Sequence, residues 1–166
     1  MNSLIILIGP SASGKSTIAN TLKEEFDNDT AVFDFDIYRE NFLNKKGDYY
    51  PVSAQMLTDN ILTALDAGYD VIVDGFYRVE NYPSLLDEVI EKHASNNYIF
   101  YFDVSLETTI KRHAERDKRD KFGEKELKQW YYPAKFVTEY GFEYKIPESY
   151  SVEKTIKYIK ETIKSN

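Results

Sequence analysis

Residues 9–16, which read Gly-Pro-Ser-Ala-Ser-Gly-Lys-Ser, constrain the fold of this chain more than any other segment. They match the pattern G-x-x-x-x-G-K-S/T and follow the short apolar run at residues 4–8. The glycines of this pattern let the backbone curl so that its N–H groups face an anion, and the helix that follows directs its positive end at the same point. The alternative is an ordinary Gly/Ser turn between two elements. The apolar run before it and the helical pattern after it favour a phosphate-binding loop.

The loop predicts a nucleoside-triphosphate site with magnesium. Lys15 and Ser16 have the side chains that reach the terminal phosphates and a magnesium ion in such loops. The residues predicted to bind the nucleotide here are Gly9, Ser11, Ala12, Ser13, Gly14, Lys15, Ser16 and Thr17.

Composition narrows the other possibilities. The 166 residues suit one domain, residues 1–166, and the absence of cysteine excludes disulfides and thiolate metal sites. With two histidines in the whole chain, any metal is expected to be bound by oxygen. The net charge of -7 disfavours a surface for long nucleic acid, although it leaves room for a local basic patch. No stretch is apolar enough to span a membrane and no signal-like segment is present, so we expect a cytoplasmic protein without a membrane partner.

Apolar runs alternate with helical patterns along the chain, which predicts an α/β fold with one parallel sheet and helices on both faces. Gly68 is expected to end a helix, Pro83 to begin one, and Ser105 and Ser151 to cap two more. The predicted strands are residues 4–8, 31–35, 71–73, 98–104 and 142–146. The clearest predicted helices are residues 15–26, 83–94, 105–119 and 151–164.

Two carboxylates, Asp34 and Asp36, lie at the end of the second predicted strand. A period of two would turn both to the same side of the sheet, at the edge where parallel sheets bind ligands. We predict that Asp34 contributes to the magnesium site, that Asp36 is a base that orients an attacking hydroxyl, and that both contact the substrate with Arg39. The alternative is a strand end followed by a helix cap.

A third carboxylate, Asp74, ends the next predicted strand and is a further candidate magnesium ligand. Arg78 follows, and we predict that it contacts an anionic group of the acceptor. A plain Asp-Gly turn and a surface pair between Arg78 and Glu80 are the alternatives.

Arg112, Arg116 and Arg119 recur at helical spacing. Two like charges on one helix face are unfavourable unless an anion joins them, and a triphosphate supplies one. Pairs with neighbouring acidic residues offer an ordinary solvated helix instead. We predict that Arg112 and Arg116 bind the nucleotide and that a lid lies near residues 112–130. Arg116 is the predicted catalytic arginine of this lid, and Arg119 is the alternative. His113 on this helix is expected to be exposed.

These motifs resemble the P-loop kinases of small molecules, which include adenylate, shikimate and gluconate kinases, polynucleotide kinases and zeta-toxin-like relatives. Residues 9–17 carry the resemblance, and Asp74-Gly75-Phe76-Tyr77-Arg78 is similar to the D-G-F-P-R segment of adenylate kinases, with Tyr77 in place of proline. The resemblance implies a three-layer fold, a five-stranded sheet in the order 2-3-1-4-5 and ATP as the nucleotide. It also implies that Asp36 is the base, that Arg112 stacks near the adenine and that residues 147–150 lie on the adenine side.

Together, these motifs predict an ATP-dependent kinase that transfers the γ-phosphoryl group to a hydroxyl of a small metabolite or nucleoside-like acceptor. Two alternatives stay open: a nucleic-acid 5′-hydroxyl kinase and a nucleotide-binding switch without catalysis. The sequence identifies neither the acceptor nor the oligomeric state.

Overall fold

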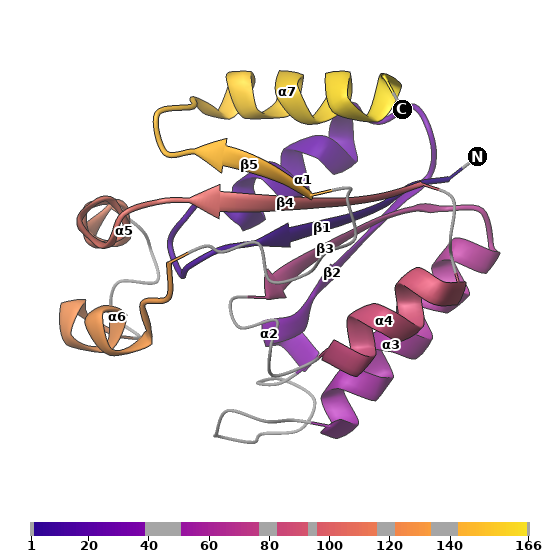
Figure 1. Cartoon of the computed structure of the whole chain (residues 1–166), viewed down its shortest axis with the longest axis horizontal. Coiled ribbons are helices and arrows are strands. Elements are labelled where there is room, and N and C mark those ends of the chain that lie inside the picture. The colour runs from indigo at the N-terminus through magenta and orange to yellow at the C-terminus, as the bar shows by residue number, and fades with distance from the viewer. Residues whose placement is uncertain are drawn as a thin grey trace.

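Five parallel strands form the central layer of the protein, as predicted (Figure 1). The computed structural model describes residues 2–38, 51–76, 83–92, 96–115, 122–133 and 143–165. The strands lie in the order β2-β3-β1-β4-β5, which confirms the predicted order. Their bounds are β1 (Leu4–Ile8), β2 (Thr30–Asp34), β3 (Asp70–Phe76), β4 (Asn97–Asp103) and β5 (Glu143–Pro147).

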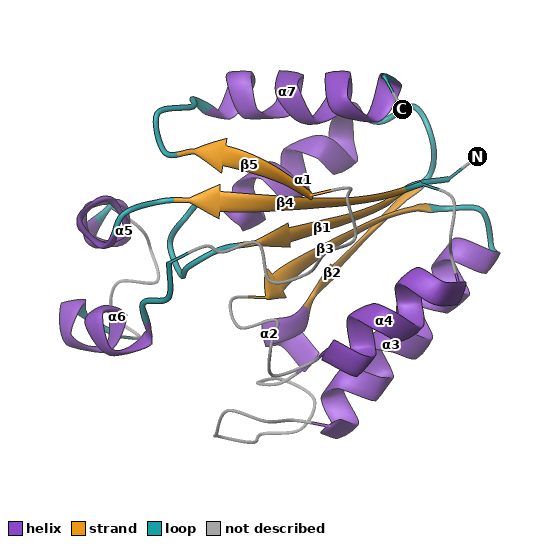
Figure 2. Cartoon of the chain, viewed as in Figure 1, coloured by secondary structure: helices purple, strands orange, loops and turns teal. Residues whose placement is uncertain are grey.

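Helices cover both faces of this sheet, which gives the three predicted layers (Figure 2). One face carries α1 (Lys15–Glu25) and α7 (Val152–Lys164), and the other carries α3 (Pro51–Asp66) and α4 (Pro83–Lys92). Three shorter helices lie beyond the carboxyl ends of the strands: α2 (Phe35–Ile37), α5 (Leu106–Ala114) and α6 (Glu124–Trp130).

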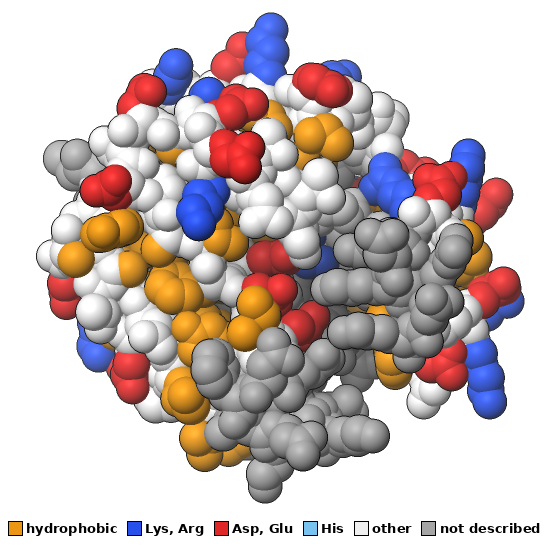
Figure 3. Space-filling model, turned by 180° about the vertical axis from the view of Figure 1, so that it is seen from behind, with side chains coloured by type: hydrophobic (Ala, Val, Ile, Leu, Met, Phe, Trp, Pro, Cys, Tyr) orange, Lys and Arg blue, Asp and Glu red, His pale blue; other side chains and the backbone are white. Residues whose placement is uncertain are grey.

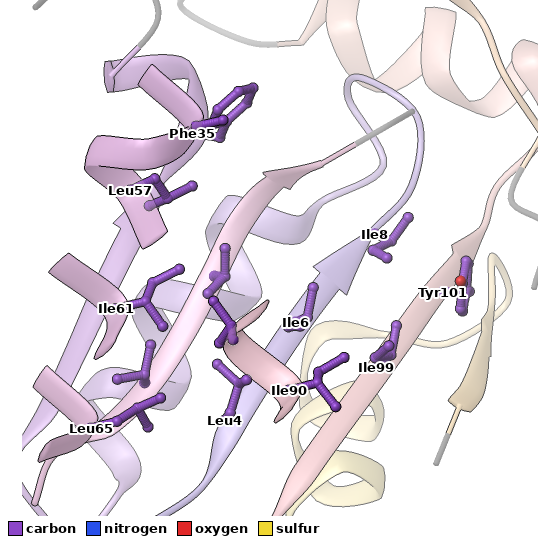
Figure 4. Close-up of a cluster of buried hydrophobic side chains, with 14 residues drawn as sticks. Leu4, Ile6, Ile8, Phe35, Leu57, Ile61, Leu65, Ile90, Ile99 and Tyr101 are labelled. Atoms are coloured by element: carbon purple, nitrogen blue, oxygen red, sulfur yellow. The ribbon is translucent and has the colours of Figure 1, made fainter. Parts of the chain in front are cut away.

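The central strand β1 explains why both faces need helices. All five of its residues are buried, and successive side chains point to opposite faces. Leu4, Ile6 and Ile8 pack with α3 and α4 (Figure 4), whereas Ile5 and Leu7 pack with α1 and α7. An apolar run without polar alternation is therefore the signature of this doubly covered strand.

The helix ends follow the predicted signals. Ser105 and Ser151 cap α5 and α7, because their hydroxyl oxygens accept hydrogen bonds from the Thr108 and Lys154 N–H groups. Gly68 follows the end of α3 with a φ of +89°, a conformation that favours glycine. Pro83 is the first residue of α4.

The structure corrects the prediction for the second strand. β2 ends at Asp34, and Phe35 is buried at the start of α2 instead of extending the strand. The Asp34 carboxylate accepts a hydrogen bond from the Asp36 N–H at 2.8 Å, which makes Asp34 the N-cap of α2. The prediction that Asp34 and Asp36 follow a period of two on one strand is therefore wrong.

The third strand runs past Asp74 to Phe76 and carries one extra residue. Ile6 pairs with Val73 and Ile8 pairs with Phe76, so Asp74 and Gly75 together lie opposite Leu7. This bulge is located at the carboxyl edge of the sheet, where bulges commonly redirect side chains.

His113 is also corrected, since it is buried rather than exposed. Its Nε2 lies 2.7 Å from the Phe122 carbonyl oxygen, and its ring stacks on the Phe122 ring at 4.4 Å between centroids. Phe122 in turn contacts Trp130 of α6, so His113 holds α5 and α6 together.

One face of the molecule has a group of acidic side chains near its centre (Figure 3). On the face opposite to Figure 1, acidic side chains lie together near the centre and hydrophobic side chains form a band beside them (Figure 3). None of the helices in the described part of the chain has the length and apolar character needed to cross a membrane.

Candidate active site

The loop between β1 and α1 has the backbone conformation expected of a phosphate-binding loop. Gly14 has a φ of +105° and Ala12 one of +62°, so the chain curls in conformations that most residues avoid. A Cβ atom at Gly9 would lie 2.8 Å from the Phe102 Cβ, because the loop passes directly over β4. Glycine at position 9 is thus required by close approach, and glycine at position 14 by conformation.

The amino end of α1 is open toward this loop. Gly14 is its N-cap without a side-chain hydrogen bond, and the first turn contains no acidic residue. The N–H groups of such a helix end carry a partial positive charge and are available to an anion.

Lys15 adds a full positive charge at the same place. Its side chain is buried, and its Nζ donates to the carbonyl oxygens of Gly9 and Pro10 at 2.9 and 3.0 Å and to the Ser13 hydroxyl at 3.3 Å. The ammonium group therefore lies inside the curl of the loop, where it would meet a bound phosphate.

Ser16 and Asp74 form the part of the site that suits a magnesium ion. The Ser16 hydroxyl donates to the Asp74 carboxylate at 2.5 Å, although the two residues are 58 positions apart. Asp74 is buried, and its second oxygen accepts from the Gly75 N–H at 2.6 Å. Hydroxyl and carboxylate oxygens are the ligands that magnesium takes.

Asp34 lies beside Asp74, because the two residues are register partners in β2 and β3. A Cβ atom built on Gly75 would lie 3.1 Å from the Asp34 Oδ1, so the two strand ends approach closely here. Asp36 follows on α2, where its backbone N–H donates a hydrogen bond to the Asp34 carboxylate. The structure thus brings Asp34, Asp36 and Asp74 to one edge, although Asp36 reaches it from a helix.

Within the described residues, no group of three or more His, Cys, Asp or Glu side chains could hold a metal ion. A magnesium ion beside Ser16 and Asp74 would therefore take further oxygens from a phosphate and from water. Together with the open helix end and Lys15, these residues fit magnesium bound to a polyphosphate.

A pocket of about 330 Å³ extends from the loop to the start of α7. Its volume is in the range of small-molecule sites. The residues that line it are Ala12, Ser13, Gly14, Thr17, Ile18, Phe102, Val104, Arg112, Ile146, Pro147, Glu148, Tyr150, Ser151, Val152 and Thr155.

Arg112 crosses this pocket from α5. Its Nη1 donates to the Ser13 carbonyl oxygen at 2.7 Å and its Nη2 to the Glu148 carbonyl oxygen at 3.2 Å. The residues expected on the adenine side, 147–150, contribute three of the lining residues. Arg112 and this segment therefore contact each other and line the same pocket.

Several predicted site residues lie outside the described residues. They are Arg39, Arg78, Arg116 and Arg119. The same holds for residues 116–121 of the predicted lid near 112–130, so the lid stays a prediction. The described part of that segment contains the end of α5 and the whole of α6.

Sequence reasoning did not single out Glu148. Its carboxylate accepts hydrogen bonds from the Ser105 N–H and hydroxyl, both at 2.8 Å. These bonds, above all the one from the Ser105 N–H, hold the pKa of Glu148 below its ordinary value of 4.5. Ser105 and Glu148 are 43 positions apart, so no local sequence pattern predicts this contact.

A protein-family model described as AAA domain matches residues 4–132, which is most of the chain. The chain belongs to the AAA domain family. The matched residues include the phosphate-binding loop, Asp34, Asp36, Asp74 and Arg112. No curated protein sequence matches this AAA-domain chain.

Solved structures of kinases share its fold. The APS kinase CysC of Mycobacterium tuberculosis, solved with AMPPNP and APS, has a TM-score of 0.75 at 14% identity and covers 98% of both chains. A gluconokinase from Sinorhizobium meliloti 1021 has a TM-score of 0.70 at 12% identity, with 99% of this chain and 92% of that chain covered. A sugar kinase from Janibacter sp. HTCC2649 has a TM-score of 0.70 at 15% identity, with 99% and 95% covered. These structures confirm the predicted fold, which this chain shares with P-loop kinases.

Proposed function

We propose that this protein is an ATP-dependent kinase that transfers the γ-phosphoryl group to a hydroxyl of a small metabolite or nucleoside-like acceptor. The observation that carries the proposal is the meeting of three parts at one sheet edge: the phosphate-binding loop with Lys15, the Ser16–Asp74 pair, and the carboxylates Asp34 and Asp36. The kinases among the similar structures support the same reaction class, since one of them binds AMPPNP together with APS.

The loop and α1 would hold the triphosphate. Phosphoryl transfer needs mainly positioning and neutralisation of charge, because the transferred group carries most of the developing charge on its oxygens. The N–H groups at the start of α1 and the Lys15 ammonium group meet both needs within one loop. Lys15 would exchange its hydrogen bonds to the loop carbonyls, at least in part, for bonds to phosphate oxygens.

Asp36 would orient the acceptor hydroxyl and take its proton. α2 places this residue at the carboxyl edge beside Asp34, and the hydrogen bond between its N–H and Asp34 fixes the start of the short helix. Arg39 and Arg78 would hold an anionic group of the acceptor, and Arg116 would neutralise charge on the transferred group. Magnesium, when bound by Ser16, Asp74 and Asp34, would neutralise the phosphate oxygens.

The test is incubation with magnesium, ATP and a library of metabolites, followed by mass spectrometry for a compound that gains a phosphate. Lys15→Ala is expected to lower the rate about 100-fold or more, since it removes a preorganised positive charge. Asp36→Asn is expected to lower it by a factor of about 10²–10⁴, the usual contribution of a positioned base. Lys23→Ala and Asp27→Ala, at exposed positions of α1 and of the loop that follows it, are the matched controls.

Three outcomes would contradict the proposal or its details. Full activity of both Lys15→Ala and Asp36→Asn would refute the assigned roles. ATP binding without product over the whole library would favour a nucleotide-binding switch. Phosphate transfer to the 5′ end of a short oligonucleotide, and to no metabolite, would favour a nucleic-acid kinase.

A further inference from the structure

Glu148 contacts helix α5 through two different groups. Its carboxylate accepts from the N–H and hydroxyl of Ser105, the N-cap of α5. Its backbone carbonyl oxygen accepts from Arg112, which lies about two turns further along the same helix. One residue of the loop between β5 and α7 therefore binds both the beginning of α5 and the side chain that α5 extends into the pocket.

The contacts of Arg112 show what this double attachment controls. Its guanidinium group bridges the Ser13 carbonyl oxygen of the phosphate-binding loop and the Glu148 carbonyl oxygen. A guanidinium is planar, so two bonds to different nitrogens fix the orientation of the whole group. The second of these bonds depends on where the backbone of Glu148 lies.

The carboxylate of Glu148 is what holds that backbone against α5. Hydrogen bonds from a helix N-cap residue to an ionised carboxylate are stronger than neutral ones, and the positive end of α5 adds to them. The lowered pKa of Glu148 indicates that the ionised form is the one these contacts favour. The Glu148 N–H also donates to the Asp103 carbonyl oxygen at 3.1 Å, which ties the loop to the end of β4.

We propose that Glu148 is a positioning residue of the nucleotide site: by binding Ser105 it holds the β5–α7 loop against α5 and so orients Arg112 across the pocket. The inference rests on the proposed function, because it assumes that the pocket receives the nucleotide. It assigns to Glu148 an effect on nucleotide affinity that passes through Arg112 and needs no direct contact with the ligand.

The first experiment measures the dissociation constant of ATP in the presence of magnesium by calorimetry. Glu148→Ala is expected to raise it about 3- to 10-fold, the effect of losing one or two partly exposed charge-assisted hydrogen bonds. Glu148→Gln keeps an oxygen that accepts both Ser105 donors and is expected to recover most of the affinity. The matched control is Glu153→Ala, because Glu153 is an exposed glutamate near the start of α7 that also has a lowered pKa and does not line the pocket. The ATP dissociation constant of Glu153→Ala should stay within about twofold of that of the wild type.

The second experiment separates positioning from a general loss of structure. In an Arg112→Ala background, Glu148→Ala should have no further effect on ATP affinity, because its effect passes through Arg112. Effects of the two substitutions that simply multiply would overturn the inference, and so would an unchanged dissociation constant for Glu148→Ala. If the wild-type protein itself binds no ATP, the proposed function fails and the inference with it, so the two failures are distinguishable.

Discussion

Replacing Gly75 with alanine tests whether the close approach of β2 and β3 shapes the site. Gly75 has a φ of +101°, and a Cβ atom there would lie 3.0 Å from the Phe35 backbone nitrogen and 3.1 Å from both the Asp34 Oδ1 and the Phe35 Cβ. The nearest of these atoms belongs to the backbone, so it cannot move away as a flexible side chain would. The Phe35 ring is itself buried in the core, which further limits the adjustment.

Two contributions make up the expected loss of stability. The positive φ costs an alanine about 1–2 kcal/mol, of which about 0.4–1 kcal/mol is recovered because alanine restricts the unfolded chain. Crowding against a packed neighbour adds about 1–3 kcal/mol. The free energy of unfolding should therefore fall by about 1–4.5 kcal/mol in Gly75→Ala.

Gly68→Ala is the matched control, because Gly68 has a similar φ of +89° and a Cβ atom there would meet nothing within 4 Å. It should show the conformational cost alone, about 1 kcal/mol. Urea unfolding of the wild type and both variants, monitored by circular dichroism, gives the three free energies. If Gly75→Ala is no less stable than Gly68→Ala, the contact between the ends of β2 and β3 does not constrain the site as argued.

Two more predictions concern packing and charge. Ile61→Ala should lower the free energy of unfolding by about 2–5 kcal/mol, whereas Val52→Ala in the same helix should change it by no more than about 0.5 kcal/mol; urea unfolding separates them, since Ile61 is 1% exposed and Val52 61%. Backbone N–H donors lower the pKa of Glu126, Glu148 and Glu153 below 4.5, so ionisation of these carboxyl groups stabilises the folded state. This stabilisation is fully present above about pH 4.5 and is lost as the pH falls through the lowered pKa values. Unfolding measured from pH 6 to pH 3 should therefore show a weaker pH dependence in Glu148→Gln than in the wild type, and identical curves would contradict this.

The fold could be predicted because its signals are local and repeated. Five apolar runs separated by helical patterns leave few arrangements other than a covered parallel sheet, and the phosphate-binding loop fixes where the first strand meets the first helix. Capping residues such as Ser105 and Ser151 work through neighbours three residues away, so their sequence signal is direct.

The predicted position of Asp36 on the second strand was wrong because two local preferences compete. Residues 31–35 read as an apolar strand, but Asp34 accepts a hydrogen bond from the Asp36 N–H and turns the chain into a helix of three residues. So short a helix has no periodicity of its own. The resulting position at the sheet edge agrees with the expectation even though the element differs.

His113 and Glu148 show a different limit. The partner of His113 is Phe122, which lies nine residues away and beyond the end of α5, and the partner of Glu148 is Ser105, on another element. Both contacts arise only when helices and loops have packed. Solvent exposure and a role in the pocket are therefore properties of the assembled chain, not of the local sequence.

The bulge of β3 at Asp74 and Gly75 separates the regularly paired part of β1 and β3 from the carboxyl edge of the sheet. Residues 4–6 and 71–73 pair in regular register before the bulge, and Leu4, Ile6, Val71 and Val73 of this part belong to one buried core cluster. If the proposed function holds, changes after Gly75 would alter the rim of the acceptor site without sliding β1 along β3.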